Sequence, residues 1–360
     1  MAQAISTPAH CHLPLQILIM GLPSAALLAV ALVATASFHG ACAFEIKEHK
    51  ITSLMAASYT PMKNDGMELD LDRIPAYAAF LAKLNITNVM PAGTNGESLS
   101  MSVPERKQLA EAWAKAGPAN GLHIYMHIGS ESLVEAMDLA RHAASLEGIS
   151  GIICMTPLYF KPTVETLHDF LAKVAGAAPE MPFWFYHFPD DTGILKGQAH
   201  SLLEHVEQTG KIPNFMGIKY TDYDLMDFSL CMQVAKGKYN MLYGRDEQAL
   251  AALDLGADAA VSSTVQYAPS LRQAIYLWSM GDKLGAKTAQ ETNARLCSLF
   301  GAYGAAAKNV QKGIMKMVCM DVGPSRLPFA DLDGGEYSAL NTLLLKNGFI
   351  DTANCSQLVV

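Results

Sequence analysis

Eight short apolar runs recur along this 360-residue chain, and the segments between them have helical periodicity. Runs that are apolar throughout are typical of parallel strands buried on both faces. They cover residues 51–62, 86–93, 123–129, 151–157, 182–188, 215–221, 239–245 and 259–264. Eight strands that alternate with helices predict an α/β protein, specifically a (β/α)8 TIM barrel.

The alternative to a barrel is an open, doubly wound sheet, which normally carries a glycine-rich phosphate loop after an early strand. Neither GxGxxG nor GxxxxGK[ST] occurs in this sequence. One of the predicted helices spans 103–116, with Ser102 as its N-cap and Gly117-Pro118 closing it. From Gly281 to about Phe349 the helical pattern continues without strands, so we expect additional C-terminal helices packed on the barrel.

The N-terminus differs in kind from the rest of the chain. Residues 13–38 contain no charged residue, and the small-x-small pattern Ala41-Cys42-Ala43 follows them. This layout predicts a secretory signal that is cleaved after Ala43, which would place the protein in the secretory pathway or outside the cell. The apolar run is long and no Lys or Arg precedes it, so a membrane-spanning signal anchor, an organelle-targeting leader and a cytoplasmic location stay open. We therefore divide the chain into a leader (1–43), one catalytic-sized barrel domain (44–350) and a tail (351–360).

The composition of the chain limits the kinds of partner and ligand that we expect. The net charge is −8 and no run of Lys or Arg occurs, which argues against nucleic acid. Beyond the leader the cysteines are odd in number and scattered, with no CxxC pair, so we expect neither a disulfide framework nor a redox motif. No cluster of His, Cys and carboxylate residues has metal-ligand spacing, so we expect no metal site.

Lys219 stands near the end of the apolar run 215–221. Burying an ammonium group is costly, and burial lowers the lysine pKa from its ordinary value of about 10.4. The neutral amine is a nucleophile toward carbonyl carbon, which makes Lys219 a candidate Schiff-base residue. The alternative is a lysine at a strand end that reaches into solvent. Gly217 should face the same way as Lys219, and we expect it to leave room for the lysine stem.

Polar residues follow most of the predicted strands. In a TIM barrel the carboxyl ends of the strands meet at one rim, where the active site lies. The polar positions are Ser58-Tyr59-Thr60, Gly93-Thr94-Asn95-Gly96-Glu97, Tyr159, Tyr186-His187, Lys219, Thr221, Gly244-Arg245-Asp246-Glu247 and Ser262-Ser263-Thr264.

Two of these positions leave alternatives open. Strand alternation places Tyr186 and His187 on opposite faces without deciding which of them faces inward. In the loop 93–97, backbone N–H groups together with Thr94 and Asn95 could hold a carboxylate. The other interpretation of that loop is a plain turn that uses glycine for positive φ.

Several of these motifs, in this order, resemble the N-acetylneuraminate lyase/dihydrodipicolinate synthase superfamily of class I aldolases. The resemblance covers about residues 50–350, and the run beginning GTNGESLSMSVPERKQ is similar to the N-acetylneuraminate lyase branch. The motifs are GTNGE (93–97), TPLYFKP around Tyr159, FYHFP around Tyr186, GIKYTDYD around Lys219, GRDEQ (244–248) and SST (262–264).

The resemblance implies a role for each candidate residue. Lys219 would form the covalent imine, without any other cofactor, and Tyr186 would carry protons. Thr94 and Asn95 would bind the carboxylate on the pyruvate side of the substrate. Tyr159 would lie near the active site of an adjacent subunit in a homotetramer. The hydroxylated part of the sugar would be held by Thr221, Gly244, Asp246, Glu247 and Ser263.

The implied reaction is cleavage of N-acetylneuraminate, a sialic acid, to N-acetylmannosamine and pyruvate. Asn95 departs from the usual GTTGE or GSTGE motif, but its amide can still donate a hydrogen bond. The turn 189–193 reads PDDTG and lacks the arginine of the synthase members, which argues against dihydrodipicolinate synthesis. Three alternatives remain: an aldolase for another 2-keto sugar acid, a non-catalytic barrel that binds sialic acid, and, for Asp246 and Glu247, a role only in beginning the next helix.

Overall fold

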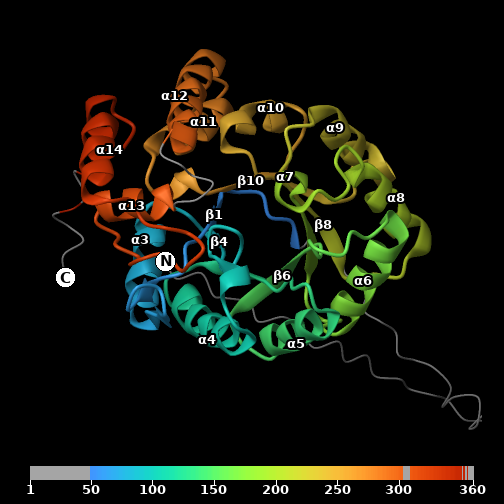
Figure 1. The fold of residues 1–360 in the computed structure, drawn as a ribbon. Coiled ribbons are helices and arrows are strands. Elements are labelled where there is room, and N and C mark those ends of the chain that lie inside the picture. The colour runs from blue at the N-terminus through green and yellow to red at the C-terminus, as the bar shows by residue number, and fades with distance from the viewer. Residues whose placement is uncertain (1–48, 303–308, 351, 353–354, 356–360) are drawn as a thin grey trace, which may run out of the picture. The chain divides into compact units, whose positions relative to one another are not determined.

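The computed structural model describes residues 49–302, 309–350, 352 and 355. The predicted leader at 1–43 and most of the predicted tail lie outside this part of the chain (Figure 1). Among the described residues, no helix combines the length and the apolar character needed to cross a membrane.

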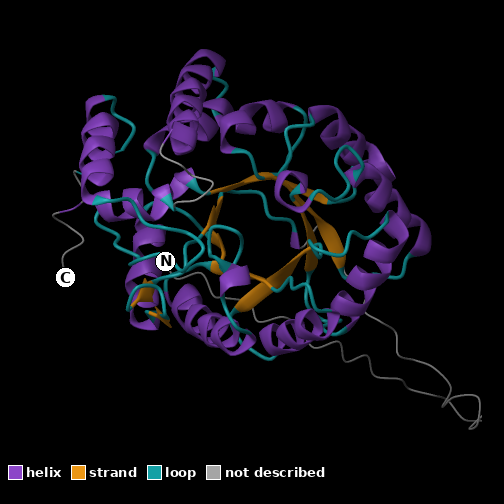
Figure 2. Cartoon of the chain, in the orientation of Figure 1, coloured by secondary structure: helices purple, strands orange, loops and turns teal. Residues whose placement is uncertain are grey.

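Eight parallel strands close into a barrel, which confirms the predicted fold (Figure 2). Each predicted apolar run overlaps one strand of the barrel, and neighbouring strands pair around the ring in the order β1-β10-β9-β8-β7-β6-β5-β4. The strands are β1 (Met55–Ala57), β4 (Asn88–Met90), β5 (His123–His127), β6 (Ile149–Met155), β7 (Phe183–His187), β8 (Phe215–Tyr220), β9 (Asn240–Tyr243) and β10 (Ala259–Ser262).

Helices form an outer layer around this barrel (Figure 2). The main helix after each strand is, in chain order, α3 (Ile74–Lys83), α4 (Val103–Ala119), α5 (Leu133–Ala144), α6 (Val164–Gly176), α8 (Ala199–Thr209), α9 (Leu225–Gln233), α10 (Ala249–Asp254) and α11 (Pro269–Ser279). Ser102 caps α4 as predicted, in a capping box with Glu105. The predicted end of α4 was wrong, because the helix runs through Gly117-Pro118 to Ala119. Pro118 has no N–H to donate to the carbonyl of Ala114, and the helix ends at the next residue.

The first predicted strand is much shorter than its apolar run. Only Met55–Ala57 pairs within the barrel, and the chain then leaves it for a small hairpin of β2 (Met62–Lys63) and β3 (Glu68–Leu69). Residues 58–62 are nevertheless buried, and the Met62 N–H donates to the carbonyl of Val322. Burial by the C-terminal segment, rather than strand pairing, explains the apolar character of this stretch.

Lys219 and Tyr186 lie on neighbouring strands and are paired in register. Tyr186 belongs to the apolar cluster inside the barrel, whereas His187 packs on the outer side against Phe185 and Tyr220. The structure thus decides the question that strand alternation left open.

The expected reason for Gly217 was wrong. The register between β7 and β8 shifts next to it, so that Trp184 pairs with Gly217. A Cβ atom on Gly217 would lie 1.9 Å from the carbonyl oxygen of Asn240 on β9. Glycine is therefore required by the close approach of the next strand and not by the lysine stem.

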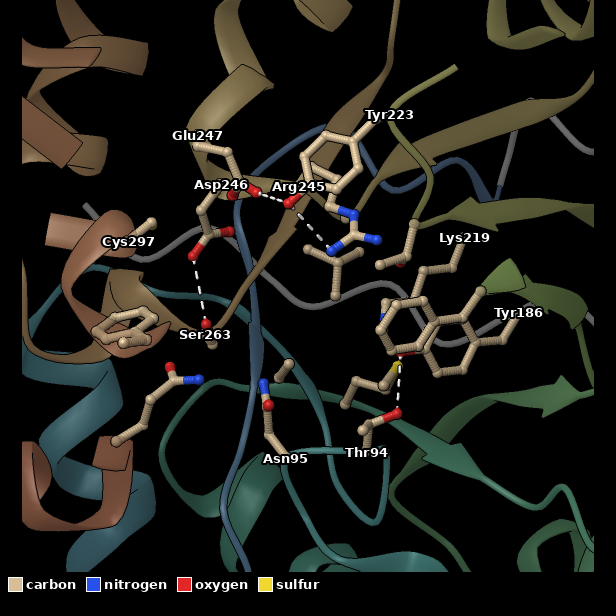
Figure 3. A pocket seen from close by; sticks show the side chains of 18 residues that line it. Thr94, Asn95, Tyr186, Lys219, Tyr223, Arg245, Asp246, Glu247, Ser263 and Cys297 are labelled. Carbon is tan, nitrogen blue, oxygen red and sulfur yellow. Dashed lines mark hydrogen bonds between the residues drawn. The ribbon is translucent and has the colours of Figure 1, made fainter. Parts of the chain in front are cut away.

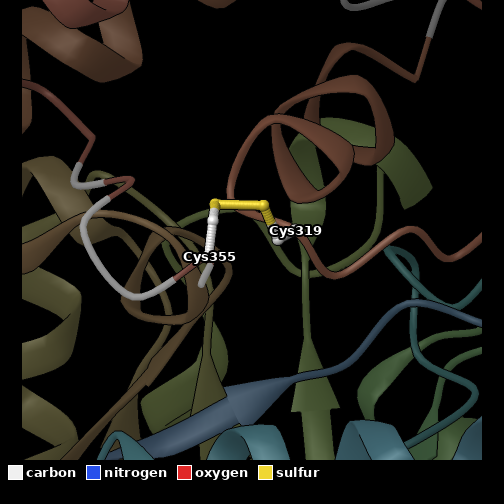
Figure 4. The surroundings of a disulfide bond; sticks show 2 residues. All are labelled: Cys319 and Cys355. Atoms are coloured by element: carbon white, nitrogen blue, oxygen red, sulfur yellow. A yellow bond between two sulfur atoms is a disulfide. The ribbon is translucent and has the colours of Figure 1, made fainter. Parts of the chain in front are cut away.

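The predicted C-terminal helices are α12 (Lys283–Ala302), α13 (Val310–Met317) and α14 (Gly334–Lys346), and the described residues from 281 to 349 contain no strand. One expectation about the cysteines was wrong, because Cys319 and Cys355 form a disulfide (Figure 4). Their spacing of 36 residues matches no short motif, and only the folding of the C-terminal segment brings their Cα atoms to 5.3 Å.

Candidate active site

A cavity of about 390 Å³ lies at the carboxyl ends of the strands and contains nearly all of the predicted site residues (Figure 3). Those that line it are Lys219, Tyr186, Thr94, Asn95, Thr221, Gly244, Asp246, Glu247 and Ser263. Tyr159 does not line it. That side chain lies in the loop after β6 and is 80% exposed, and its backbone N–H donates to the carboxylate of Glu131.

Lys219 is buried inside the barrel near the end of β8, with 3% of its surface exposed. This burial contradicts the interpretation of a lysine that reaches into solvent. Desolvation holds the pKa of Lys219 well below its ordinary value; the nearby carboxylate of Asp246 opposes this shift and the Arg245 guanidinium adds to it. A lowered pKa leaves more of the amine neutral, and hence nucleophilic, at a given pH.

Tyr186 lies directly beside the amine. The Lys219 Nζ is 3.4 Å from the centroid of the Tyr186 ring, and the Tyr186 hydroxyl is 3.1 Å from Thr94 Oγ1. Burial raises the pKa of Tyr186 above its ordinary value, so the phenol is protonated near neutral pH. It is therefore a proton donor, and it can accept a proton only while passing its own to Thr94 or to a carboxylate in the cavity.

The loop 93–97 carries two residues of the cavity wall: Thr94, which contacts Tyr186, and Asn95. It is a tight turn in which the Glu97 N–H donates to the Thr94 carbonyl. Positive φ angles occur at Ala92 and Glu97 rather than at the two glycines of the loop, so the interpretation of a plain glycine turn was wrong. Gly96 is needed for a different reason: a Cβ atom there would lie 2.8 Å from the backbone nitrogen of Ala92.

Carboxylates line another side of the cavity, after β9. Asp246 is buried and accepts hydrogen bonds from Ser262 Oγ (2.9 Å), the Thr264 N–H (2.8 Å) and Ser263 Oγ (3.4 Å). Burial raises the pKa of Asp246, and the hydrogen bonds from Thr264 and Ser262 oppose the shift. Glu247 accepts a hydrogen bond from the Tyr223 hydroxyl. Both carboxylates lie in the first turn of the short helix η4 (Asp246–Gln248), as the alternative interpretation expected, and both also line the cavity.

Gly244 makes room for a hydroxyl on the cavity wall. A Cβ atom at Gly244 would lie 2.1 Å from Thr221 Oγ1. In the described part of the chain the Thr221 hydroxyl has no hydrogen-bond partner, which leaves it able to bind a ligand. Glycine at this position therefore serves the cavity and not a turn.

The sequence did not assign a role to Arg245, although it lies within the GRDEQ motif. Its guanidinium is 2.5 Å from Asp190 Oδ2, and it stacks 4.0 Å from the Tyr223 ring centroid (Figure 3). The segment 189–193, which lacks the synthase arginine, is thus bound by an arginine that follows β9. Beside this pair, burial raises the pKa of Asp191.

The C-terminal helices also contribute to the cavity wall, through Cys297, Phe300 and Gln311. No sequence signal marked these three residues, because their contribution depends on how α12 and α13 pack. Among the described residues, no group of His, Cys, Asp and Glu is arranged to hold a metal ion.

Comparison with known proteins identifies the family to which the chain belongs. The model of the Dihydrodipicolinate synthetase family matches residues 50–347. The chain belongs to the dihydrodipicolinate synthetase family. It is 38% identical to N-acetylneuraminate lyase of Homo sapiens over 284 residues, which are 78% of this chain and 87% of that protein. It is 43% identical to N-acetylneuraminate lyase of Gallus gallus over 221 residues, 61% of this chain and 70% of that protein. The solved structure of Proteus mirabilis N-acetylneuraminate lyase aligns with a TM-score of 0.78 and 30% identity, covering 84% of this chain and all of that one.

The lowered pKa of Lys219 predicts the pH dependence of imine formation. Below its pKa the amine is protonated and unreactive, so the rate of pyruvate trapping by cyanoborohydride should rise with pH and then level off. We expect the plateau well below the pH of about 10.5 at which an exposed lysine is half deprotonated. Nα-acetyl-lysine amide, measured in parallel, provides the unburied control. A rate that still rises between pH 9 and 10.5, like that of the control, would contradict the effect of burial.

Proposed function

We propose that this protein is a class I aldolase that cleaves N-acetylneuraminate to N-acetylmannosamine and pyruvate, with Lys219 as the imine-forming residue. The observation that carries the proposal is the desolvated amine of Lys219, which lies 3.4 Å from the ring centroid of Tyr186 in a cavity lined by hydroxyl and carboxylate groups. The identity to relatives named N-acetylneuraminate lyase supports the choice of substrate.

The reaction begins at the C2 ketone of the open-chain substrate. The neutral amine of Lys219 attacks this carbon, and loss of water gives a protonated imine. Thr94 and Asn95 bind the neighbouring carboxylate through their hydroxyl and amide donors. The proton that the departing oxygen needs comes from Tyr186, which Thr94 orients through their 3.1 Å contact.

The protonated imine then acts as the electron sink. A base removes the C4 hydroxyl proton, the C3–C4 bond breaks, and its electron pair moves into an enamine on Lys219. N-acetylmannosamine leaves as the aldehyde. Protonation at C3 and hydrolysis of the imine release pyruvate and restore the amine. We assign the proton transfers to Tyr186 acting with the substrate carboxylate, because a phenol of raised pKa is a weak base by itself.

The sugar tail is held, on this proposal, by Asp246, Glu247, Ser263, Thr221 and Gly244. Carboxylates and hydroxyls accept hydrogen bonds from the hydroxyls of the substrate. Since the tail is absent from pyruvate, these contacts matter for cleavage and not for imine formation with pyruvate.

Asp246→Ala and Glu247→Ala should therefore weaken use of N-acetylneuraminate while pyruvate trapping is unchanged. We expect kcat/KM to fall about tenfold or more for each variant, as for a lost hydrogen bond to a charged group. Asp246→Ala should also lower the unfolding temperature, because Asp246 accepts three hydrogen bonds from residues 262–264. Equal losses in cleavage and in trapping would indicate a barrel defect, and no loss in either would show that the tail is held elsewhere.

The direct test of the proposed function is a turnover assay with N-acetylneuraminate and a panel of other 2-keto sugar acids, coupled to pyruvate detection. Preference for another acid would make the protein a related pyruvate-dependent aldolase. Borohydride trapping with pyruvate distinguishes both from a barrel that binds sialic acid without turnover, since only an imine-forming lysine gains irreversible mass.

We further propose that the protein is a homotetramer in which Tyr159 approaches the active site of an adjacent subunit. Tyr159 and Phe160 are both largely exposed and contact each other edge to face, as expected of aromatic side chains left for a partner. Light scattering of the purified protein tests the assembly, and a monomeric mass would contradict it.

For the compartment, we propose entry into the secretory pathway with cleavage after Ala43. The Cys319–Cys355 disulfide supports this proposal, since disulfides persist in oxidising compartments and are rare in the cytosol. Sequencing the N-terminus of the mature protein tests it. A mature chain that retains the residues before Ala43 would contradict cleavage at this site.

A further inference from the structure

Gln311 brings an amide group from the C-terminal helices to the cavity wall. Its oxygen, Oε1, accepts hydrogen bonds from the hydroxyls of Tyr59 (2.9 Å) and Tyr267 (2.6 Å). Both tyrosines are buried, and burial raises the pKa of each well above its ordinary value, so both remain protonated donors. The structure thus orients the amide with its oxygen toward both hydroxyls.

The opposite end of this amide is therefore the –NH₂ group. Among the described residues, no hydrogen-bond acceptor contacts the Gln311 Nε2. The side chain is only partly buried and lines the cavity together with Asn95 and Ser263. The hydroxyl of Tyr59 also lies 3.4 Å from the Ser263 carbonyl, so Gln311 lies beside the part of the site assigned to the sugar tail.

The position of Gln311 is fixed by the docking of α13. Lys312, the next residue, forms an ion pair of 2.7 Å with Glu97, and both side chains are at most 1% exposed. Glu97 also accepts hydrogen bonds from Asn309 Nδ2 (3.3 Å) and the Arg326 N–H (2.9 Å). A buried carboxylate with this many partners holds its neighbours in one arrangement. Because Glu97 ends the 93–97 loop, α13 is fastened to the same loop that carries Thr94 and Asn95.

A free N–H donor complements the other groups in this part of the cavity. The carboxylates of Asp246 and Glu247 can bind only donors on a ligand. A carbonyl oxygen on the tail, such as that of an acylamido group, requires a donor from the protein, and a hydroxyl oxygen can use one as well.

We propose that Gln311 is a substrate-binding residue that donates its amide N–H to an acceptor oxygen on the tail of the substrate. This inference rests on the proposed function, since it assumes a 2-keto sugar acid whose ketone is bound at Lys219. It gives α13 a part in substrate binding, beside the groups that follow the barrel strands.

Gln311→Leu removes the donor and keeps most of the side-chain volume. We expect kcat/KM for N-acetylneuraminate to fall about tenfold, mainly through a higher KM, because the lost contact exists in both the ground state and the transition state. The rate of pyruvate trapping should not change, since pyruvate has no tail. Gln233→Leu, at an exposed glutamine of α9, provides the matched control. An unchanged KM in Gln311→Leu would overturn the proposal, and so would equal losses in cleavage and trapping, which would make Gln311 a structural residue only.

Gln311→Glu identifies the acceptor. The carboxylate still accepts from Tyr59 and Tyr267 but presents an acceptor, not a donor, to the cavity. If the partner is the acyl carbonyl, this variant should lose activity on N-acetylneuraminate and retain it on the analogue with a hydroxyl at C5. If the partner is a hydroxyl, which can reverse its role and donate, both substrates should be used nearly as well as by the wild type. Gln311→Glu also guards against misfolding of the leucine variant, because it preserves both tyrosine contacts.

Measurements on the wild-type protein test the proposed function separately from the role of Gln311. If it forms the pyruvate adduct but prefers another 2-keto sugar acid, the proposed substrate fails, and the comparison of Gln311→Leu with the wild type is made on the preferred acid. A higher KM for that acid with unchanged trapping would still support Gln311 as a substrate-binding residue. An unchanged KM would overturn it.

Discussion

Lys219→Ala should abolish both cleavage of N-acetylneuraminate and formation of a reducible pyruvate adduct, while the barrel remains folded. The amine is the group that becomes covalently bound, so no residual imine pathway is expected in its absence. The amine is buried against the Tyr186 ring. Among the described residues, no second lysine lines the cavity that could replace it. The measurements are turnover, mass after borohydride reduction with pyruvate, and thermal unfolding.

The unfolding measurement has its own expected sign. The folded-state pKa of Lys219 is lower than that of the unfolded chain, so below about pH 10.5 the unfolded state binds the proton more tightly and the lysine destabilises the fold. Lys219→Met, which keeps the apolar stem and removes the amine, should therefore unfold at the same or a higher temperature at neutral pH. Lys238→Ala, at a surface ion pair, is the control and should keep full activity. A reducible adduct in Lys219→Ala would show that another residue forms the imine.

The fold followed from the sequence because its signals are local. Each strand of the barrel is buried on both faces, so each is an apolar run that can be recognised by itself, and parallel strands place their polar ends at one rim. That rule grouped Thr94, Tyr186, Lys219 and Asp246 correctly even though more than 150 residues separate the first from the last. Strand lengths were less predictable, since burial by a distant segment makes residues 58–62 look like strand.

What the sequence did not reveal depends on contacts between elements that are far apart in the chain. Gly217 is glycine because β9 passes within 1.9 Å of where its Cβ would be, and no local pattern records that approach. The pairing of Cys319 with Cys355 and the entry of Gln311 into the cavity both depend on how the C-terminal helices return to the barrel. Arg245 stood in a recognised motif, yet its partner Asp190 lies 55 residues earlier, in the short helix α7 (Pro189–Thr192).

Removing the hydroxyl of Tyr186 distinguishes its role in proton transfer from the role of Lys219 in imine formation. Tyr186→Phe removes one oxygen and keeps the ring beside the Lys219 amine, so the packing inside the barrel should be unchanged. The variant loses the contact between the Tyr186 hydroxyl and Thr94 Oγ1, and with it the phenolic proton donor beside Lys219. We expect kcat to fall about 100-fold or more, the range for loss of a positioned proton-transfer group.

Pyruvate trapping in Tyr186→Phe should be slowed but retained, because the nucleophile is intact and water can supply protons slowly. Tyr239→Phe is the matched control: Tyr239 is equally buried, but its hydroxyl donates to Glu207 and does not line the cavity. Near-normal turnover in Tyr186→Phe would place the proton carrier elsewhere, and the next candidate would be Tyr159 of an adjacent subunit. In that case Tyr159→Phe should reduce kcat in the assembled protein, whereas with Tyr186 as the carrier its effect should be confined to substrate binding or assembly.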